Sequence, residues 1–135
     1  MSDGTEQPKT GKFRPKQPVD LPPSKDDVIT REYLSKCNGE NEGFPTYVAI
    51  KGTVFDVSRN EAYAVGKSYH VFAGKEPNYG LGTSKLAPEF AVPEDKERGL
   101  VLTESERKVL EDWYTFFKNR YAIVGRLEPE SSVSL

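Results

Sequence analysis

The pattern of polar and apolar positions changes near residue 28. Up to that point the chain carries half of its ten prolines, and its basic and acidic residues balance. The large apolar residues of this part are Met1, Phe13, Val19 and Leu21. Such a segment buries too little apolar surface to offset its conformational entropy, so we predict that residues 1–27 are disordered. The alternative, a basic arm that docks on a partner or a membrane surface, is disfavoured because the charges cancel.

Two short apolar runs after residue 40 predict a β-hairpin. Residues 47–50 and 53–57 are rich in β-branched and aromatic side chains, and only Lys51 and Gly52 separate them. A two-residue connection with a glycine available for positive φ favours a tight hairpin turn. Ahead of the hairpin, Thr30 can cap a short helix that runs to Cys37, which would place the Cys37 side chain in the core.

The clearest helical pattern lies toward the C-terminus. Thr103 and Glu106 have the spacing of a capping box, in which each side chain accepts from the other residue's backbone N–H. Large apolar residues then recur at helical spacing: Val109, Leu110, Trp113, Phe116 and Phe117. We therefore predict a helix over residues 104–119 with one buried face, followed by a closing strand at residues 121–124.

The order of these elements predicts an α+β fold. Short helical turns are expected at residues 70–75 and 77–85, between the hairpin and the long helix. Strands and helices are thus segregated rather than alternating, and a chain of 135 residues suits one domain. We assign residues 28–128 to this domain and residues 129–135 to a C-terminal tail.

Composition excludes several classes of function. A net charge of −2 with dispersed Lys and Arg is unlike a nucleic-acid binder. One cysteine and one histidine exclude a tetrahedral thiolate zinc site and any site built on two imidazoles. The chain shows no phosphate loop, nucleophile elbow or acid/base cluster, so we predict that it is not an enzyme. No apolar run approaches the roughly 20 residues of a membrane helix, which favours a cytoplasmic location.

A tyrosine-rich loop at residues 63–80 carries the candidate chemistry. It sets Tyr63, Tyr69 and Tyr79 among glycines, and it holds the chain's one histidine, His70. A phenol must lose its proton to bind iron, and a ferric ion favours the resulting phenolate. Neighbouring side chains on an extended segment point apart, so we expect a partly exposed His70 that does not share one face of a metal with Tyr69.

Three blocks of the sequence resemble a known family. They are Tyr47-Val-Ala-Ile-Lys-Gly-Thr-Val-Phe-Asp-Val57, Tyr69-His-Val-Phe-Ala-Gly-Lys-Glu76 with Gly80-Leu-Gly82, and Asp112-Trp-Tyr-Thr-Phe-Phe with Tyr121-Ala-Ile-Val-Gly-Arg-Leu127. In this order, over residues 28–127, they resemble the cytochrome b5-like haem/steroid-binding domain. More narrowly, they are similar to the membrane-associated progesterone receptor family, which includes the fungal damage-response protein. The resemblance implies a small mixed sheet with short helices and one longer C-terminal helix.

The resemblance also implies that haem b is bound through a tyrosine, as a five-coordinate ferric haem with one open face. Tyr69 falls on the axial-ligand position, and Tyr63 matches a pocket tyrosine that hydrogen-bonds near the haem. Arg120 and Tyr121 fall on a pair that contacts the haem, and the Arg120 cation suits a propionate. The implied haem-binding residues are Tyr63, Tyr69, Val71, Phe72, Arg120 and Tyr121, with Tyr69 as the iron ligand.

Two functions from different classes remain open. The first is a haem-binding module that supports cytochrome P450 enzymes of sterol metabolism; an anionic donor stabilises ferric iron, which disfavours general electron transfer. The second is a haem-free module that binds a steroid, a lipid or a protein in the same cleft. Lys67, Ser68 and His70 favour it because they depart from the family's pattern in the ligand loop.

The first function carries two further expectations. An exposed haem face would let two copies of the chain pair by stacking, giving a haem-mediated homodimer. Support of P450 enzymes adds peripheral association with the endoplasmic reticulum membrane as an alternative to a purely cytoplasmic location.

Overall fold

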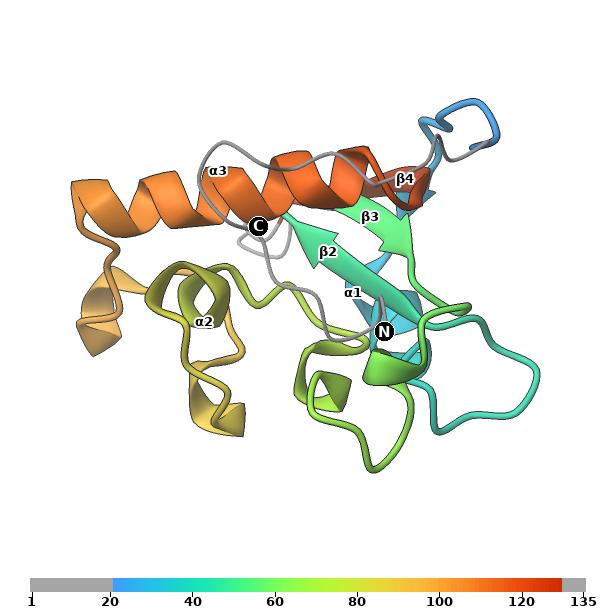
Figure 1. Cartoon of the computed structure of the whole chain (residues 1–135), viewed down its shortest axis with the longest axis horizontal. Coiled ribbons are helices and arrows are strands. Elements are labelled where there is room, and N and C mark those ends of the chain that lie inside the picture. The colour runs from blue at the N-terminus through green and yellow to red at the C-terminus, as the bar shows by residue number, and fades with distance from the viewer. Residues whose placement is uncertain (1–20, 130–135) are drawn as a thin grey trace, which may run out of the picture.

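The computed structural model describes residues 21–129 (Figure 1). Most of the N-terminal segment that we predicted to be disordered, and most of the C-terminal tail, lie outside the described residues. Residues 25–27 are described and belong with the domain, because the Lys25 N–H donates to the Ile123 carbonyl (3.1 Å) and the Asp27 carbonyl accepts from the Arg126 N–H (2.7 Å). These hydrogen bonds connect the residues just before the predicted boundary at residue 28 to the closing strand.

A four-stranded mixed sheet forms one half of the domain. Its strands are β1 (Val28–Ile29), β2 (Tyr47–Ile50), β3 (Thr53–Asp56) and β4 (Ala122–Leu127), in the order β1-β4-β3-β2. The predicted hairpin is confirmed: β2 and β3 are antiparallel, and Lys51 and Gly52 both have positive φ, 52° and 83°. Strand β4 is longer than we predicted because it pairs with β3 on one side and, in parallel, with β1 on the other.

The helices follow the predicted order. They are α1 (Arg31–Lys36), α2 (Asn78–Thr83) and α3 (Glu104–Lys118), with single 3₁₀ turns η2 (Glu61–Tyr63), η3 (His70–Phe72), η4 (Pro88–Phe90) and η5 (Lys96–Arg98). Two predicted caps are confirmed. The Thr30 hydroxyl accepts from the Tyr33 N–H (3.0 Å), and both hydrogen bonds of the Thr103/Glu106 capping box are present.

The sheet separates a large core from a small one. Val48, Ile50 and Phe55 face the large core, where they meet the apolar face of α3. Ala49 and Val54 point to the opposite face and pack with the α1 residue Leu34 in the small core. This alternation is the two-residue period of a strand that is buried on both faces. The predicted apolar stripe of α3 is therefore core packing.

Helix α2 packs beside the N-terminal half of α3, away from the sheet (Figure 1). A Cβ atom at Gly82 would lie 2.8 Å from Leu102 Cδ2 and 3.0 Å from the Glu106 carbonyl oxygen. Gly80 similarly admits the Phe90 carbonyl, 2.8 Å from where its Cβ would lie. The two glycines of α2 thus allow backbone approaches that any larger residue would block.

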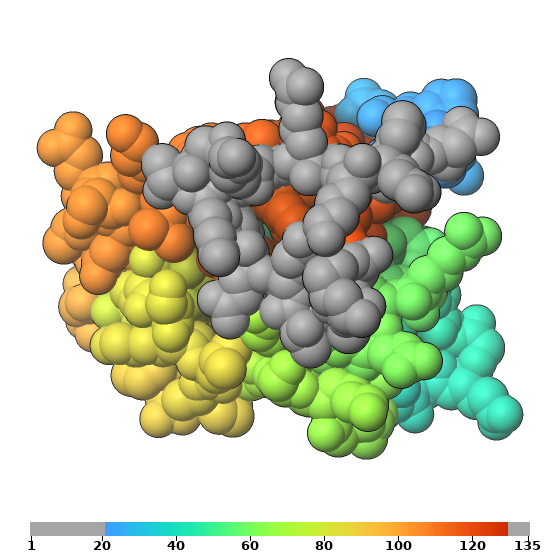
Figure 2. Space-filling view, viewed as in Figure 1, coloured from blue at the N-terminus to red at the C-terminus, as the bar shows by residue number. Residues whose placement is uncertain are grey.

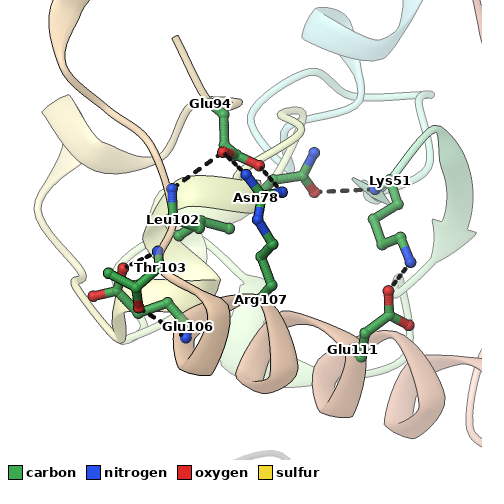
Figure 3. A network of polar contacts seen from close by, with 8 residues as sticks. All are labelled: Lys51, Asn78, Glu94, Leu102, Thr103, Glu106, Arg107 and Glu111. Carbon is green, nitrogen blue, oxygen red and sulfur yellow. Dashed lines mark hydrogen bonds and ion pairs between the residues drawn. The ribbon is translucent and has the colours of Figure 1, made fainter. Parts of the chain in front are cut away.

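Polar contacts join α2 and the linker after it to α3 and to the hairpin turn (Figure 3). Both Glu94 carboxylate oxygens accept from the Arg107 guanidinium at 2.9 Å, and Glu94 also accepts the Leu102 N–H (3.1 Å). The Lys51 N–H donates to Asn78 Oδ1 at the start of α2 (3.0 Å), and the Lys51 ammonium pairs with Glu111 of α3. These contacts fix α2 and the linker after it relative to the hairpin.

The Glu76 carboxylate also anchors the hairpin turn. One of its carboxylate oxygens accepts the Gly52 N–H (2.8 Å), and the other lies 3.6 Å from the Arg31 guanidinium. Its side chain is only 9% exposed, so these contacts offset the cost of burying a charge. Glu76 therefore joins α1, the hairpin turn and the segment before α2.

The α2–α3 contact predicts a cost for Gly82→Ala. The added methyl group would overlap Leu102 and the α3 backbone, and overpacking of this kind costs about 1–3 kcal/mol. The higher helix propensity of alanine returns up to about 1 kcal/mol, so we expect a net loss of about 1 kcal/mol or more in the free energy of unfolding. Urea denaturation measures this free energy. Lys108→Ala, a control at an exposed position of α3, should change the free energy of unfolding by less than about 0.5 kcal/mol. Equal stabilities of Gly82→Ala and the wild type would contradict the close α2–α3 contact.

Candidate functional site

Three predicted site tyrosines meet in the large core. Tyr63 ends the turn η2, Tyr69 directly precedes η3, and Tyr121 lies between α3 and β4. The Tyr63 ring centroid is 5.6 Å from that of Tyr69 and 6.5 Å from that of Tyr121. All three residues are buried, with exposed fractions of 2%, 4% and 9%. The fold thus brings together phenols that are up to 58 positions apart in the sequence (121 − 63).

Aromatic side chains enclose these phenols. Trp113 of α3 meets the Tyr69 ring edge-on (6.0 Å), and Phe72 lies 5.9 Å from the Tyr69 ring on another side. Phe117 packs against both Tyr63 (6.2 Å) and Tyr121 (4.8 Å). The result is an aromatic enclosure, in which rings pack around the three phenols.

Backbone hydrogen bonds hold the segments that carry Tyr63 and Tyr69 next to each other. The Tyr69 N–H donates to the Ala62 carbonyl of η2 (2.9 Å), so the segments that carry Tyr63 and Tyr69 lie against each other. After η3, Gly74 has a φ of +74° and donates its N–H to the Tyr47 carbonyl (2.7 Å). A Cβ atom at Gly74 would lie 2.7 Å from Asn38 Cβ, so this glycine lets the loop return close to the end of α1.

The Tyr63 phenol keeps its proton in the folded state. Burial raises its pKa well above the ordinary 10.0, and the neighbouring Tyr121 and Tyr69 act in the same direction. A side-chain hydrogen bond with Tyr121 raises the pKa further. The Arg120 guanidinium opposes these effects and lowers the pKa of Tyr63. Arg120 also lies over the Phe116 ring, 5.3 Å from its centroid.

Asn60 contacts the cluster and was missed by the sequence analysis. Its Nδ2 donates to Tyr121 Oη (2.6 Å), while its Oδ1 accepts the Ala62 N–H (2.9 Å) and so caps η2. An asparagine just before a turn is a recognisable cap in sequence. The contact with Tyr121, 61 positions along the chain, leaves no pattern among the residues next to Asn60.

His70 is partly exposed, as predicted, but it starts the turn η3 and does not lie on the extended segment that the prediction assumed. Its Nε2 lies 2.9 Å from the Asn38 carbonyl oxygen and 3.5 Å from a Glu40 carboxylate oxygen. A hollow of about 530 Å³ adjoins it, lined by Asn38, Glu40, Gly66, Lys67, Ser68, His70, Val71, Ala73, Lys75 and Pro88. Val71 thus borders this hollow, whereas Phe72 packs on Tyr69. In the space-filling view, the η2–η3 segment (green) and the α2 segment (yellow) adjoin below α3 (Figure 2).

The ligands available for a metal are few. Within residues 21–129, no group of three or more His, Cys, Asp or Glu side chains could hold a metal ion. Cys37 is fully buried, as predicted, and burial raises the pKa of its thiol to about 11. A metal held in this part of the chain would therefore need other donors, such as the tyrosine oxygens, or a cofactor that brings its own. None of the helices described there is long and apolar enough to span a bilayer.

Known sequences similar to the chain are named as binding or regulatory proteins. An Arabidopsis thaliana protein named "Probable steroid-binding protein 3" is 42% identical over 100 residues, which cover 73% of this chain and 96% of that protein. "Cytochrome P450 regulator dap1" of Schizosaccharomyces pombe is 32% identical over 127 residues, 91% of this chain and 68% of that protein. A neuferricin homolog of Caenorhabditis briggsae is 34% identical, but the chain spans only 32% of its length. No protein-family model matches the chain.

A solved structure supports the fold directly. An Arabidopsis thaliana protein described as having a cytochrome b5-like fold has a TM-score of 0.65 and 40% identity to this chain. The match covers 76% of this chain and 92% of that protein. The predicted cytochrome b5-like fold is therefore confirmed. None of the three relatives' names gives an enzymatic activity.

The buried Tyr63 phenol predicts a loss of stability at high pH. Its folded-state pKa is raised, so the native state keeps a proton that the unfolded state releases near pH 10. The stabilisation is complete below that pH and is lost as pH rises above it, by up to about 1.4 kcal/mol per pH unit for one proton. In Tyr63→Phe, the free energy of unfolding should therefore fall less steeply between pH 10 and 11.5 than in the wild type.

Denaturation curves at several pH values measure this slope. Phe72→Leu disturbs the same cluster without removing a titratable group, so it should lower stability and leave the slope unchanged. Equal slopes in the wild type and Tyr63→Phe would contradict a buried neutral phenol.

Proposed function

Since the chain belongs to the membrane-associated progesterone receptor family of cytochrome b5-like proteins, we propose that it binds haem b through Tyr69 and acts on cytochrome P450 enzymes as a regulatory partner. The observation that carries this proposal is the convergence of Tyr63, Tyr69 and Tyr121 within one aromatic enclosure, with Arg120 within electrostatic reach. These residues supply the parts that haem requires: an anionic oxygen ligand, apolar surface for the macrocycle, and a cation for a propionate.

We assign the phenols different roles, with Tyr69 as the iron ligand and Tyr63 as a hydrogen-bond donor beside it. Tyr63 keeps its proton because burial raises its pKa, so it suits a hydrogen-bond donor better than an iron ligand. Tyr69 contacts the rings of Phe72 and Trp113, which supply apolar surface. A ferric haem bound there would supply a Lewis-acidic iron of low reduction potential. Tyr69 would hold that iron, and Arg120 would neutralise a propionate.

Single tyrosine ligation leaves the other axial position open. His70, the one imidazole of the chain, is hydrogen-bonded to the Asn38 carbonyl and faces the hollow instead of the tyrosine cluster. It therefore does not serve as a second axial ligand in this arrangement. A five-coordinate haem with an open face could also stack against a second copy of the chain and form a homodimer.

The proposed partner class is the cytochrome P450 enzymes of sterol metabolism. A relative that aligns with 91% of this chain is named as a cytochrome P450 regulator, and the tyrosinate ligand disfavours simple electron transfer. A regulator of membrane-bound P450 enzymes would act in the cytoplasm or at the surface of the endoplasmic reticulum.

A second candidate is steroid or lipid binding without haem. The "Probable steroid-binding protein 3" name of a 42%-identical relative favours it. The aromatic enclosure also suits a flat apolar ligand, with Tyr63 and Tyr121 as hydroxyl donors. A colourless protein that ignores hemin but shows shifts of tyrosine or tryptophan signals on steroid addition would favour this candidate.

Hemin titration tests the first candidate. Wild-type protein should give a ferric tyrosinate absorption spectrum, and Tyr69→Phe should weaken hemin binding by more than the roughly 10–100-fold that loss of a supporting hydrogen bond costs. Tyr47→Phe, a matched change at a tyrosine that packs with the small core, should bind hemin as the wild type does. Undiminished affinity in Tyr69→Phe would refute the assignment. Sedimentation with and without hemin measures the dimer, and an unchanged mass would exclude it.

A further inference from the structure

Asn60 uses all four of its polar groups to connect distant parts of the site. Its backbone N–H donates to the Val57 carbonyl at the end of the hairpin (2.9 Å), and its carbonyl accepts the Tyr63 N–H (3.2 Å). Its Oδ1 accepts the Ala62 N–H (2.9 Å), and its Nδ2 donates to Tyr121 Oη (2.6 Å). One side chain therefore starts the turn η2 and contacts the segment between α3 and β4.

The two side-chain contacts fix the orientation of the Asn60 amide. A backbone N–H can only donate, so the atom that faces Ala62 must be the amide oxygen. The atom that faces Tyr121 is then the NH₂ group, and the Tyr121 oxygen must accept from it. The proton of the Tyr121 hydroxyl is therefore directed away from Asn60.

The other tyrosines depend on the same residue through η2. Tyr63 is the last residue of this turn, and its N–H bonds directly to Asn60. The carbonyl of Ala62, whose N–H Asn60 caps, accepts the Tyr69 N–H (2.9 Å). Asn60 thus lies one or two hydrogen bonds from each of the three phenol-bearing residues.

We infer that Asn60 is a positioning residue of the haem site, which fixes Tyr121 relative to Tyr63 and Tyr69 and sets the direction of the Tyr121 hydroxyl. The inference rests on the proposed haem-binding function. The hydrogen bonds of its side chain go to Tyr121 and to the Ala62 N–H. Its effect on a bound haem would pass through the position of Tyr121.

Few substitutions could keep both contacts. Aspartate keeps the acceptor for Ala62 but has no N–H for Tyr121, so the Tyr121 hydroxyl would have to donate to it. Serine also caps turns, but its shorter side chain cannot reach Tyr121 at the same time. The pair Asn60→Asp and Asn60→Ser therefore removes the donor while keeping the cap of η2.

The test measures hemin affinity in the full-length chain. Asn60→Asp and Asn60→Ser should each weaken hemin binding about tenfold, with little change in the midpoint of thermal unfolding. In a Tyr121→Phe background, Asn60→Ser should cause no further loss, because the partner hydroxyl is already gone. Asn78→Asp, a matched change at an asparagine whose Oδ1 bonds to the Lys51 N–H, should bind hemin as the wild type does.

A second measurement needs no haem. In ¹H–¹⁵N spectra of the haem-free protein, the Asn60 side-chain amide should show one shifted proton signal, and Tyr121→Phe should move it toward the ordinary position. Wild-type affinity in both Asn60 variants, or additive losses in the Tyr121→Phe background, would overturn the inference while leaving the haem proposal intact. An unshifted amide signal would also overturn it. Failure of the wild type to bind hemin would instead overturn the proposed function, and the amide signal would still report whether Asn60 holds Tyr121.

Discussion

The packing of Phe117 joins the sheet to the candidate site, and the rest of the structure depends on it. The fully buried Phe117 ring meets Phe55 of the sheet edge-on at 5.3 Å, Tyr121 at 4.8 Å and Tyr63 at 6.2 Å. Truncating a buried phenylalanine costs about 3–5 kcal/mol, a large share of the stability of a small domain. The contact thus fixes α3 on the sheet and positions two of the three site tyrosines together. Stability and site geometry are consequences of the same packing.

Electrostatic effects on the Tyr63 phenol act in opposite directions. Burial raises its pKa well above 10.0, while the Arg120 guanidinium lowers it. In the proposed haem site, Tyr69 would be the one oxygen ligand, and a chain with a single histidine lacks the paired imidazoles of an electron carrier. This difference would explain how a cytochrome b5-like fold serves regulation instead of electron transfer.

Local sequence signals predicted much of the fold. The Thr103/Glu106 capping box, the Lys51-Gly52 turn and the apolar stripe of α3 each depend on residues close in sequence, and each is present in the structure. The pairing of β1 with β4 was not predicted, because two residues carry no periodicity. Glu76 and Asn60 were missed as anchors for a related reason: their partners lie far along the chain, and only the folded structure brings them together. The tyrosines of the site were found through family resemblance, since a single tyrosine is otherwise indistinguishable from ordinary core packing.

The central claim is that Tyr69 binds ferric iron as a phenolate. Resonance Raman spectroscopy of the hemin complex, prepared once with natural and once with ring-deuterated tyrosine, tests it most directly. Phenolate bands that shift on deuteration in the wild type and vanish in Tyr69→Phe are the predicted result. A hemin complex whose spectrum contains no tyrosine band, or keeps the same bands in Tyr69→Phe, would contradict it.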